Sequence, residues 1–586
     1  MAPSLRDIPG SNRPRKRFAG SRQRDLWAPP RSSGLDLTPR GLRLDRSRRF
    51  RRRPRVDLGI LAIAVAALGV LLWMGTSFWS ATRVNVEIEG LRDGDALRPG
   101  AAEALDISIR VADSDDRFRA VVSVDGIDVL DDLGFTGDTV RIRPAELVSS
   151  KLVEGALEEG THTIALSVGR LFLPDADFRW VYTVDSVAPE LRLPEDVAPV
   201  PIDEPTTVRG KVEPDALLRM NGEEVEVEGG RFAVTFEHPP TGTLRFEATD
   251  PAGNWTVAET VVRVHYPTSS RAVHVSAAGW ADTELRAGVL ALIEERRIDT
   301  VQLDLKDESG AIGYLSEVPM AKRIGAVRAQ FDLAEAVRML ESRGVRVIGR
   351  LVAFRDPIYA KWAWSVGRKD EVLQTPDGEM LSAYGGFANY VHPTVQKYNL
   401  DLALEAVRFG VHDILWDYIR RPEGAPDTMV VPGLRGASAD VVVRFLDRSH
   451  QALRELGVYQ GASVFGIAAR SGDSIAQDVP AMARVVDYLA PMIYPSHWGP
   501  GQYGVARPIR EPQEITLRSL ADFQLVTAGS GVHLLPWIQD FTLYGVTYGA
   551  AEVRAQIDAA ASLGLEGFLL WNPNVRYTGS ALTPIV

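Results

Sequence analysis

Cysteine is absent from all 586 residues of this chain. The absence excludes a disulfide framework, cysteine-ligated zinc and a thiol nucleophile. The nine histidines form neither an HxH nor an HExxH pattern, so we expect no catalytic metal, and no motif points to a cofactor. No GxSxG segment occurs either, which argues against a serine esterase of the α/β-hydrolase type.

Acidic residues are scarce in one part of the chain. Residues 1–55 hold 17 Lys/Arg and 4 Asp/Glu, a net charge of +13, so the remaining residues carry −11 − 13 = −24. This segment is rich in Arg, Pro and Ser and has no hydrophobic period, and we predict that it is a disordered cytoplasmic tail. Nucleic-acid binding is the alternative interpretation of such a basic segment.

Charge is missing altogether from residues 58–79, which read LGILAIAVAALGVLLWMGTSFW. An apolar run of about 20 residues is long enough to cross about 30 Å of hydrocarbon. Arginines at 48–55 precede it, so we predict a single-pass signal-anchor helix over 56–80, with the N-terminus cytoplasmic and the C-terminal domains outside the cell membrane. A cleaved signal peptide is the alternative, although its apolar region is normally shorter.

Short runs of alternating apolar and polar residues fill 84–266, as in HTIALSVG and TLRFEATD. Turn residues such as Asn221-Gly222 and Gly229-Gly230 separate the runs. The pattern predicts two all-β sandwich domains, one over 84–185 and an immunoglobulin-like one over 186–266. We expect them to act as spacers, because no cluster of exposed aromatic residues indicates carbohydrate binding.

From residue 272 onward, apolar runs alternate with helical stretches, which predicts βα units and a parallel sheet. Gly344, Gly410, Gly457 and Gly564 each follow a helical stretch, where a helix C-cap favours a left-handed residue. An open doubly wound sheet is the competing fold, but no glycine-rich phosphate loop follows any strand. We therefore predict a (β/α)8 TIM barrel over 272–580, with strands at 274–278, 300–305, 346–353, 413–416, 459–465, 486–493, 532–537 and 567–571.

Polar and aromatic residues gather after the C-terminal ends of these strands, where TIM barrels carry their active sites. The first candidate is Asp417 in the segment DILWDYIRRP, residues 413–422. Glycoside hydrolysis needs two carboxyl groups, and Asp540, Asp304 and Asp473 are the candidate partners. A structural ion pair of Asp417 with Arg420 or Arg350 is the alternative.

Flat aromatic side chains beside hydrogen-bonding groups suit a carbohydrate cleft, although a tryptophan in a barrel is as often a core residue. The predicted polysaccharide-binding residues are Lys306, Arg350, Trp416, Tyr418, Arg420, Tyr494, His497, Trp498, Trp537, Gln539, Trp571 and Asn572.

Six motifs in order, VQLDLKDESGAIGY, RVIGRLVAFRDP, DILWDYIRRP, VDYLAPMIYPSHW, LPWIQDF and GFLLWNPN, resemble a bacterial family of glycoside hydrolase-like TIM-barrel domains once catalogued only as a domain of unknown function. The resemblance covers about 273–577 and implies a barrel hydrolase acting on an α- or β-linked polysaccharide. One departure is Ser463, where the family commonly has Asp directly before Val-Phe-Gly.

We therefore expect a multidomain α/β protein: a membrane-anchored, extracytoplasmic glycoside hydrolase acting on a cell-surface or environmental polysaccharide, with no nucleic-acid partner. A catalytically inactive barrel that serves as a glycan-binding or cell-envelope scaffold is the alternative, and Ser463 is the feature that favours it.

Overall fold

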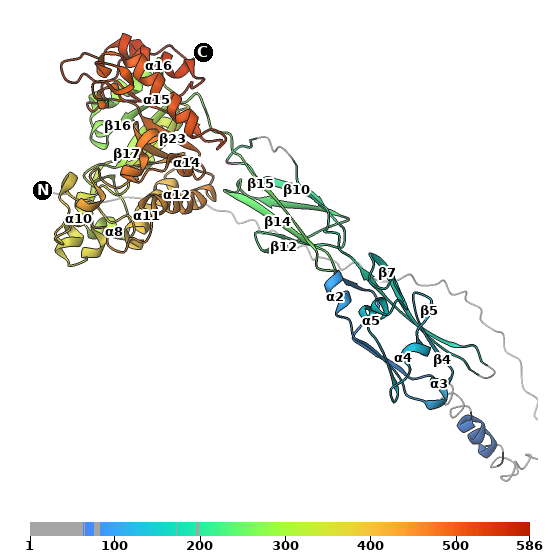
Figure 1. Ribbon diagram of the computed structural model, residues 1–586. Helices are drawn as coiled ribbons and strands as arrows, with labels where there is room; N and C mark the ends of the chain where they lie inside the picture. Colours follow the sequence, from blue (N-terminus) through green and yellow to red (C-terminus); the bar gives the residue numbers. More distant parts are fainter. Residues whose placement is uncertain (1–62, 64, 75–82, 171–172, 195–198, 586) are drawn as a thin grey trace, which may run out of the picture. The chain divides into compact units, whose positions relative to one another are not determined.

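The computed structural model of the chain describes residues 63, 65–74, 83–170, 173–194 and 199–585 (Figure 1). The chain divides into two compact units, Met1–Arg83 and Val84–Val586. The predicted tail over 1–55 and half of the predicted anchor over 56–80 lie outside the described residues. Among the helices that are described, none combines the length and the apolarity needed to cross a membrane.

Residues 84–185 form two facing sheets around one hydrophobic core. Strict alternation of buried and partly exposed residues in β7 shows how the sequence pattern places one face of a strand in this core. One sheet is antiparallel and the other contains one parallel pair, β2 with β8. The sheets are β1 (Val86–Glu89), β3 (Ile107–Val111), β6 (Thr139–Ile142), and β2 (Asp95–Leu97), β8 (Ala176–Val184), β7 (Gly160–Val168), β4 (Ala120–Val124), β5 (Ile127–Asp128), with helices α2 (Pro99–Glu103), α3 (Ser114–Phe118), α4 (Leu130–Leu133) and α5 (Pro144–Ser149).

Residues 186–266 form a second pair of antiparallel sheets around a separate core. Asn221 and Gly222 adopt φ of 50° and 92° between β11 and β12, which is the hairpin turn that their sequence predicts. Residues 186–266 thus contain two β-sheets, and their assignment as an immunoglobulin-like sandwich stays a prediction. The sheets are β13 (Arg231–Phe236), β10 (Thr206–Val212), β9 (Leu191–Arg192), and β12 (Glu223–Val225), β11 (Leu217–Met220), β14 (Thr243–Thr249), β15 (Trp255–Val261).

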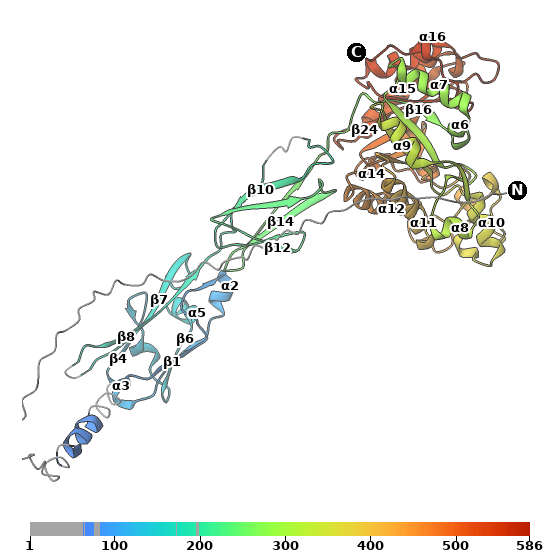
Figure 2. The same ribbon diagram turned by 180° about the vertical axis from the view of Figure 1, so that it is seen from behind.

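The C-terminal region is a closed barrel of eight parallel strands, as predicted, since β16 pairs with both β17 and β26. Figure 2 shows this region with its helices around the strands. Around the barrel the order is β16 (Arg271–Val275), β17 (Thr300–Lys306), β20 (Arg346–Val352), β21 (Asp413–Asp417), β22 (Tyr459–Phe465), β23 (Tyr488–Met492), β24 (His533–Leu534) with β25 (Trp537–Gln539), and β26 (Phe568–Trp571); β18 (Ile312–Tyr314) and β19 (Val327–Phe331) extend the sheet from β17.

Two predicted strand boundaries were wrong. The first strand ends at Val275 rather than at 278, because Ala277–Ala281 forms helix α6, capped by the Ser276 hydroxyl. The seventh strand is interrupted before Trp537, since Pro536 has no amide hydrogen with which to continue the ladder.

Amphipathic helices cover the barrel and bury their apolar faces against the strands. The four predicted C-cap glycines all have positive φ, between 69° and 91°. A second core, which includes Ile348, Leu415 and Leu569, fills the barrel interior. The helices are α7 (Thr283–Glu294), α8 (Pro319–Arg323), α9 (Leu333–Glu341), α10 (Pro357–Ser365), α11 (Pro393–Arg408), α12 (Ser438–Arg454), α13 (Ala468–Ser471), α14 (Val479–Met482), α15 (Pro512–Val526) and α16 (Ala550–Ser562).

Candidate functional site

One arginine joins three carboxylates at the C-terminal end of the barrel. Arg350, on β20, donates from Nε to Asp417 at 2.8 Å and from Nη1 to Asp304 at 2.8 Å. Its Nη2 contacts Glu308, in the loop after β17, as well as Asp417. Because β17, β20 and β21 are neighbours in the barrel, three distant segments of the sequence meet at this guanidinium. We call Asp304, Glu308, Arg350 and Asp417 the Arg350 cluster.

The Arg350 cluster carries three negative charges against one positive charge, a net of −2. Burial raises the pKa of Asp304, but Arg350 and His274 outweigh it and hold that pKa below its ordinary value. Burial likewise opposes ionisation of Glu308, and Arg350 again brings its pKa below the ordinary value. Both carboxyls are therefore ionised near neutral pH. The His274 Nε2 atom lies 3.0 Å from Asp304 Oδ2.

Glu308 is the member of the cluster that sequence reasoning missed. Its side chain is 37% exposed, whereas those of Asp304 and Asp417 are 5% and 3% exposed. It is therefore the carboxylate that an approaching substrate meets first. A signal was present, since Glu308 lies two residues beyond the end of β17 in a polar segment that the family resemblance includes.

Asp417 ends β21 and belongs to the Arg350 cluster. Tyr418 adopts φ of 46°, a left-handed conformation, and donates its amide to Asp417 Oδ1 at 2.6 Å, which fixes the carboxylate. Of the two ion pairs considered as alternatives for Asp417, the one with Arg350 is present. Arg420 instead pairs with Glu423 at 3.0 Å.

An aromatic wall adjoins the cluster. Tyr494 stacks on Trp571 at 5.3 Å with 28° between the rings, and Phe541 packs against the edges of both. Burial and then the negative charge of Asp417 hold the Tyr494 pKa well above its ordinary value. His497 meets the Tyr494 ring edge at 4.9 Å. Its side chain is exposed although surrounding protein lowers its pKa, as expected for a residue lining a concave surface.

A group of cationic and aromatic side chains surrounds Tyr418, the residue that follows Asp417 in the sequence. Arg355 lies over the rings of Tyr384 and Tyr418, at 5.0 and 4.9 Å, and donates to the Tyr418 hydroxyl at 2.7 Å. Arg420 lies over Tyr418 at 4.8 Å and over Phe465 at 4.4 Å. Tyr418 and Arg420 thus lie near Asp417, but each already has partners within the protein.

Two predicted substrate-binding residues are structural. Lys306 is fully buried, and its Nζ lies 2.7 Å from Asp356, 2.9 Å from Asn399 and 3.2 Å from the Ala353 carbonyl, so it has no donor left for a substrate. Trp416 is fully buried between β21 and α12, where it packs on Phe445. The prediction that Lys306 and Trp416 bind the substrate is therefore wrong, since both side chains belong to the protein interior.

Several other predicted residues organise the loops around the site. Trp537 points into the barrel and donates from Nε1 to Ser463 Oγ at 3.2 Å. Gln539 is fully buried and accepts the Ser496 amide at 3.1 Å. Trp498 packs on the Tyr503 ring at 4.8 Å. The polar groups of Trp537 and Gln539 are thus engaged within the protein, whereas the buried Nε1 of Trp498 has no hydrogen-bond partner among the described residues.

The other carboxylates proposed as partners of Asp417 lie outside the Arg350 cluster. Asp540 accepts the Thr578 amide at 2.7 Å and the Thr578 hydroxyl at 2.6 Å, and burial raises the Asp540 pKa. Asn572 bonds in turn to the Arg576 carbonyl at 2.7 Å, so these residues hold the segment after β26. Asp473 is exposed in a short 3-10 turn. Within the described ranges, no group of three His, Asp or Glu side chains is arranged to hold a metal ion.

Comparison with protein families gave one model match, described as "Putative glycosyl hydrolase domain", over residues 272–577. Curated proteins gave no match. Among solved structures, a hypothetical protein from Ruminiclostridium thermocellum is 24% identical, with 32% of this chain and 96% of that chain covered and a TM-score of 0.29.

Two further structures are more distant in sequence. The Bacillus cereus spore cortex-lytic enzyme SleL is 11% identical, with 56% and 77% covered and a TM-score of 0.32. An alpha-galactosidase from Thermus thermophilus is 14% identical, with 72% and 86% covered and a TM-score of 0.36. At these TM-scores the structural likeness carries no argument about the activity of this chain.

Proposed function

The chain belongs to the family described as "Putative glycosyl hydrolase domain", and from that premise we propose that its barrel hydrolyses glycosidic bonds in a polysaccharide. The observation that carries the proposal is the Arg350 cluster, in which a buried Asp417 and a partly exposed Glu308 share one guanidinium nitrogen. Two neighbouring carboxyl groups at the C-terminal end of a barrel are the minimum that this reaction requires.

The charge of the cluster suits the reaction. Glycoside hydrolysis passes through a transition state with positive charge on the sugar ring, and a buried net charge of −2 stabilises that state more than the neutral substrate. Arg350 contacts Asp417 through two nitrogens and orients it. We assign to Asp417 the role of the ionised carboxylate at the reacting carbon.

Glu308 is assigned the proton transfer to and from the glycosidic oxygen. Its side chain reaches solvent, and Arg350 keeps it ionised in the free protein. A bound sugar that displaces water adds burial, and burial raises the pKa of a carboxyl. Substrate binding therefore shifts Glu308 toward the protonated form that a general acid needs.

The aromatic wall gives the sugar a place to bind. Tyr494 and Trp571 offer stacked rings beside the carboxylates, and His497 is exposed next to them. Among the described residues we find no hydrogen-bond partner for the Tyr494 hydroxyl, which leaves it for a sugar hydroxyl. The negative cluster favours a neutral sugar at the cleavage point over a polyanionic one.

Incubation of the full chain with bacterial and plant polysaccharides, followed by an assay for new reducing ends, tests the proposal. We expect release by the wild type and a loss of at least about 100-fold in Asp417→Asn and in Glu308→Gln. Asp473→Asn is the matched control and keeps the wild-type rate. Full activity in Glu308→Gln with loss in Asp540→Asn would transfer the second carboxyl role to Asp540.

A glycan-binding scaffold is the second candidate, favoured by two observations. The pKa values of Asp304 and Glu308 are both lowered in the free protein, so neither carboxyl is held protonated as an acid catalyst. Ser463 also has its hydroxyl engaged by Trp537 inside the barrel. Glycan binding that is equal in the wild type and Asp417→Asn, with no reducing ends on any polysaccharide, would favour the scaffold.

We further propose that residues 58–79 anchor the protein in the cell membrane with the barrel outside. The support is the uncharged sequence and the arginines before it. Fractionation of cells that express the full chain and a variant lacking residues 58–79 tests this. Recovery of both forms in the same soluble fraction would contradict the proposal.

A further inference from the structure

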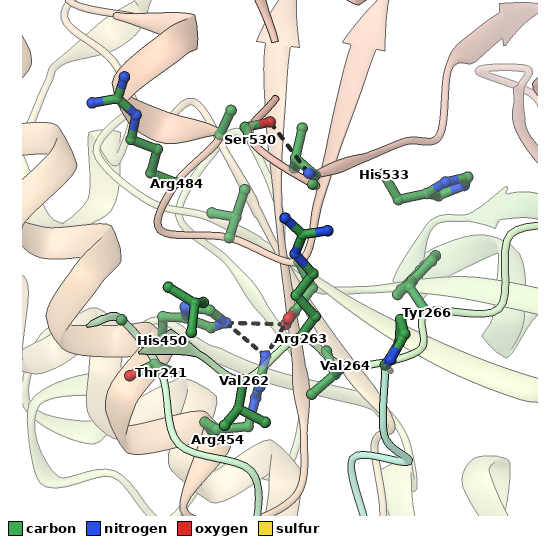
Figure 3. Close-up of a pocket in the computed structure, with 18 of the residues that line it drawn as sticks. Thr241, Val262, Arg263, Val264, Tyr266, His450, Arg454, Arg484, Ser530 and His533 are labelled. Carbon is green, nitrogen blue, oxygen red and sulfur yellow. Dashed lines mark hydrogen bonds and ion pairs between the residues drawn. The ribbon is translucent and has the colours of Figure 1, made fainter. Parts of the chain in front are cut away.

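A cavity of about 430 Å³ lies at the other end of the barrel from the carboxylates. Asp487 and His533, which line it, stand at the N-terminal starts of β23 and β24, whereas Asp417 ends β21. The segment after β15, which carries Arg263, forms another side (Figure 3). The cavity is therefore separate from the Arg350 cluster and is not used by the proposed reaction.

Positive charge dominates this cavity. Arg263, Arg454 and Arg484 line it from three separate segments, and Asp487 is the carboxylate among its lining residues (Figure 3). Three positive charges and one negative charge leave a net of +2. The rest of the chain beyond residue 55 carries −24, so this cavity stands out from a strongly acidic protein.

Asp487 has no capacity left to neutralise a second arginine. Its Oδ1 accepts from Arg454 Nη2, and its Oδ2 faces His450 Nε2 at 3.2 Å and accepts the Gln460 amide at 2.8 Å. Arg263 and Arg484 are both exposed, and the guanidinium group of neither makes a hydrogen bond or an ion pair in the part of the chain that is described. Two guanidinium groups are therefore available to a ligand.

A buried donor also lacks an acceptor here. Arg454 is 4% exposed, and its Nε has no hydrogen-bond partner among the described residues. Buried donors of this kind are normally satisfied, so one that lines a cavity indicates an acceptor supplied from outside the chain. His533 adds no further positive charge, because burial lowers its pKa to about 4.

We propose that this cavity binds a phosphate monoester carried by a sugar or polyol. Guanidinium groups bind phosphate oxygens in pairs, and a phosphate monoester carries a charge close to −2 near neutral pH, which matches the net charge of the lining. A carboxylate offers half that charge and two oxygens. The cavity volume is many times that of one water molecule, about 30 Å³, so it accommodates the carrier as well as the phosphate.

Isothermal titration of the full chain with glucose 6-phosphate, inorganic phosphate, glucuronate and glucose tests the assignment. We expect glucose 6-phosphate to bind most tightly and its affinity to fall as NaCl is raised. Arg263→Gln with Arg484→Gln should weaken it by at least about 10-fold, while the double lysine variant, which keeps the charge, should lose less. Both arginines are exposed and unpaired, so these variants fold.

The matched control is the double variant Arg209→Gln with Arg219→Gln. Both arginines are exposed and lie in the β domain of residues 186–266, outside the cavity lining, so the control removes the same amount of charge. This control and Asp417→Asn should bind glucose 6-phosphate as the wild type does, whether or not the barrel is a hydrolase. No binding of glucose 6-phosphate, equal binding in the Arg263/Arg484 variant, or tighter binding of glucuronate or glucose would overturn the proposal.

Discussion

At the scale of single residues, Arg350 decides the geometry of the candidate site. Its planar guanidinium donates from Nη1 to Asp304 and from Nε to Asp417, and its Nη2 contacts both Glu308 and Asp417. These acids come from two strands and a loop. A lysine offers one compact charge and cannot match three carboxylates at fixed angles. The three acids are therefore held together by a fork-shaped cation and not by positive charge alone.

Substitution of Arg350 tests this directly. Arg350→Met removes the one cation that the three carboxylates share, and we expect the free energy of unfolding to fall by about 3–5 kcal/mol. Arg350→Lys should recover part of the stability but little of any hydrolytic rate, because the carboxylates lose their orientation. Thermal unfolding and the reducing-end assay measure the two effects; equal activity in Arg350→Lys would argue against an orienting role.

Asp304 makes the stability of the barrel depend on pH in a defined direction. Its pKa in the folded protein lies below the ordinary value of about 3.9, so its ionised form stabilises the fold at higher pH. That contribution is full above pH of about 5 and is lost as the pH falls below about 4. We expect the melting-temperature difference between wild type and Asp304→Asn to be largest at neutral pH and to narrow in acid; a constant difference would contradict this.

At the scale of elements, a barrel strand such as β21 buries one face in the barrel interior and the other against the surrounding helices. Leu415 lies in the barrel interior, whereas Ile414 and Trp416 lie between the barrel and its helices. Asp413 and Asp417 share the inward side with Leu415, because successive side chains of a strand point in opposite directions. This alternation also excludes Trp416 from the floor of a site that contains its neighbour Asp417.

The packing of β22 against β23 depends on a glycine, Gly461, at a position where a larger residue has no room. A Cβ on Gly461 would lie 2.2 Å from the ring of Tyr488, which is fully buried. Gly461→Ala should therefore destabilise the protein by about 1–3 kcal/mol. Gly288→Ala, in α7 with no neighbour within 4 Å of its Cβ, is the control and should stabilise by about 0.5–1 kcal/mol. Thermal unfolding distinguishes them, and similar melting temperatures would contradict the packing argument.

At the scale of the unit Val84–Val586, one tyrosine anchors the segment that enters the barrel. The Tyr266 hydroxyl donates to Asp413 at 3.1 Å, its ring lies 4.7 Å from that of Tyr488, and Arg346 lies 4.9 Å over it. The segment from β15 to β16 is thus packed into the N-terminal end of the barrel. The same end carries the basic cavity, while the acidic cluster lies at the opposite end.

Removal of this anchor should loosen the segment. Tyr266→Ala empties a buried ring site, and we expect a loss of about 3–5 kcal/mol together with faster proteolysis between residues 262 and 270. Tyr266→Phe keeps the ring and should lose about 1–3 kcal/mol. Tyr544→Ala, with a side chain that is 79% exposed, serves as the control. Proteolysis of Tyr266→Ala at the wild-type rate would show that the segment is held elsewhere.

The sequence alone determined the elements and the barrel. Period-2 runs, amphipathic helices and glycines after helices depend on neighbours within a few residues, so they can be read without tertiary contacts. Eight such strands with helices between them predict a closed barrel, and Asp304, Asp417 and Arg350 were placed near its C-terminal end for that reason.

Only the tertiary structure decided which polar side chains meet. A register irregularity between Asp304 and Lys306 breaks the alternation, so Asp304 joins Arg350 while Lys306 turns to Asp356 behind the strand. Glu308 reaches the cluster through a loop that is held by a hydrogen bond from the Ile358 amide of α10 to the Ser309 carbonyl. Local pattern specifies strands and helices because their causes are local, whereas a site built from three strand ends is set by register and loop path, which depend on the packed barrel.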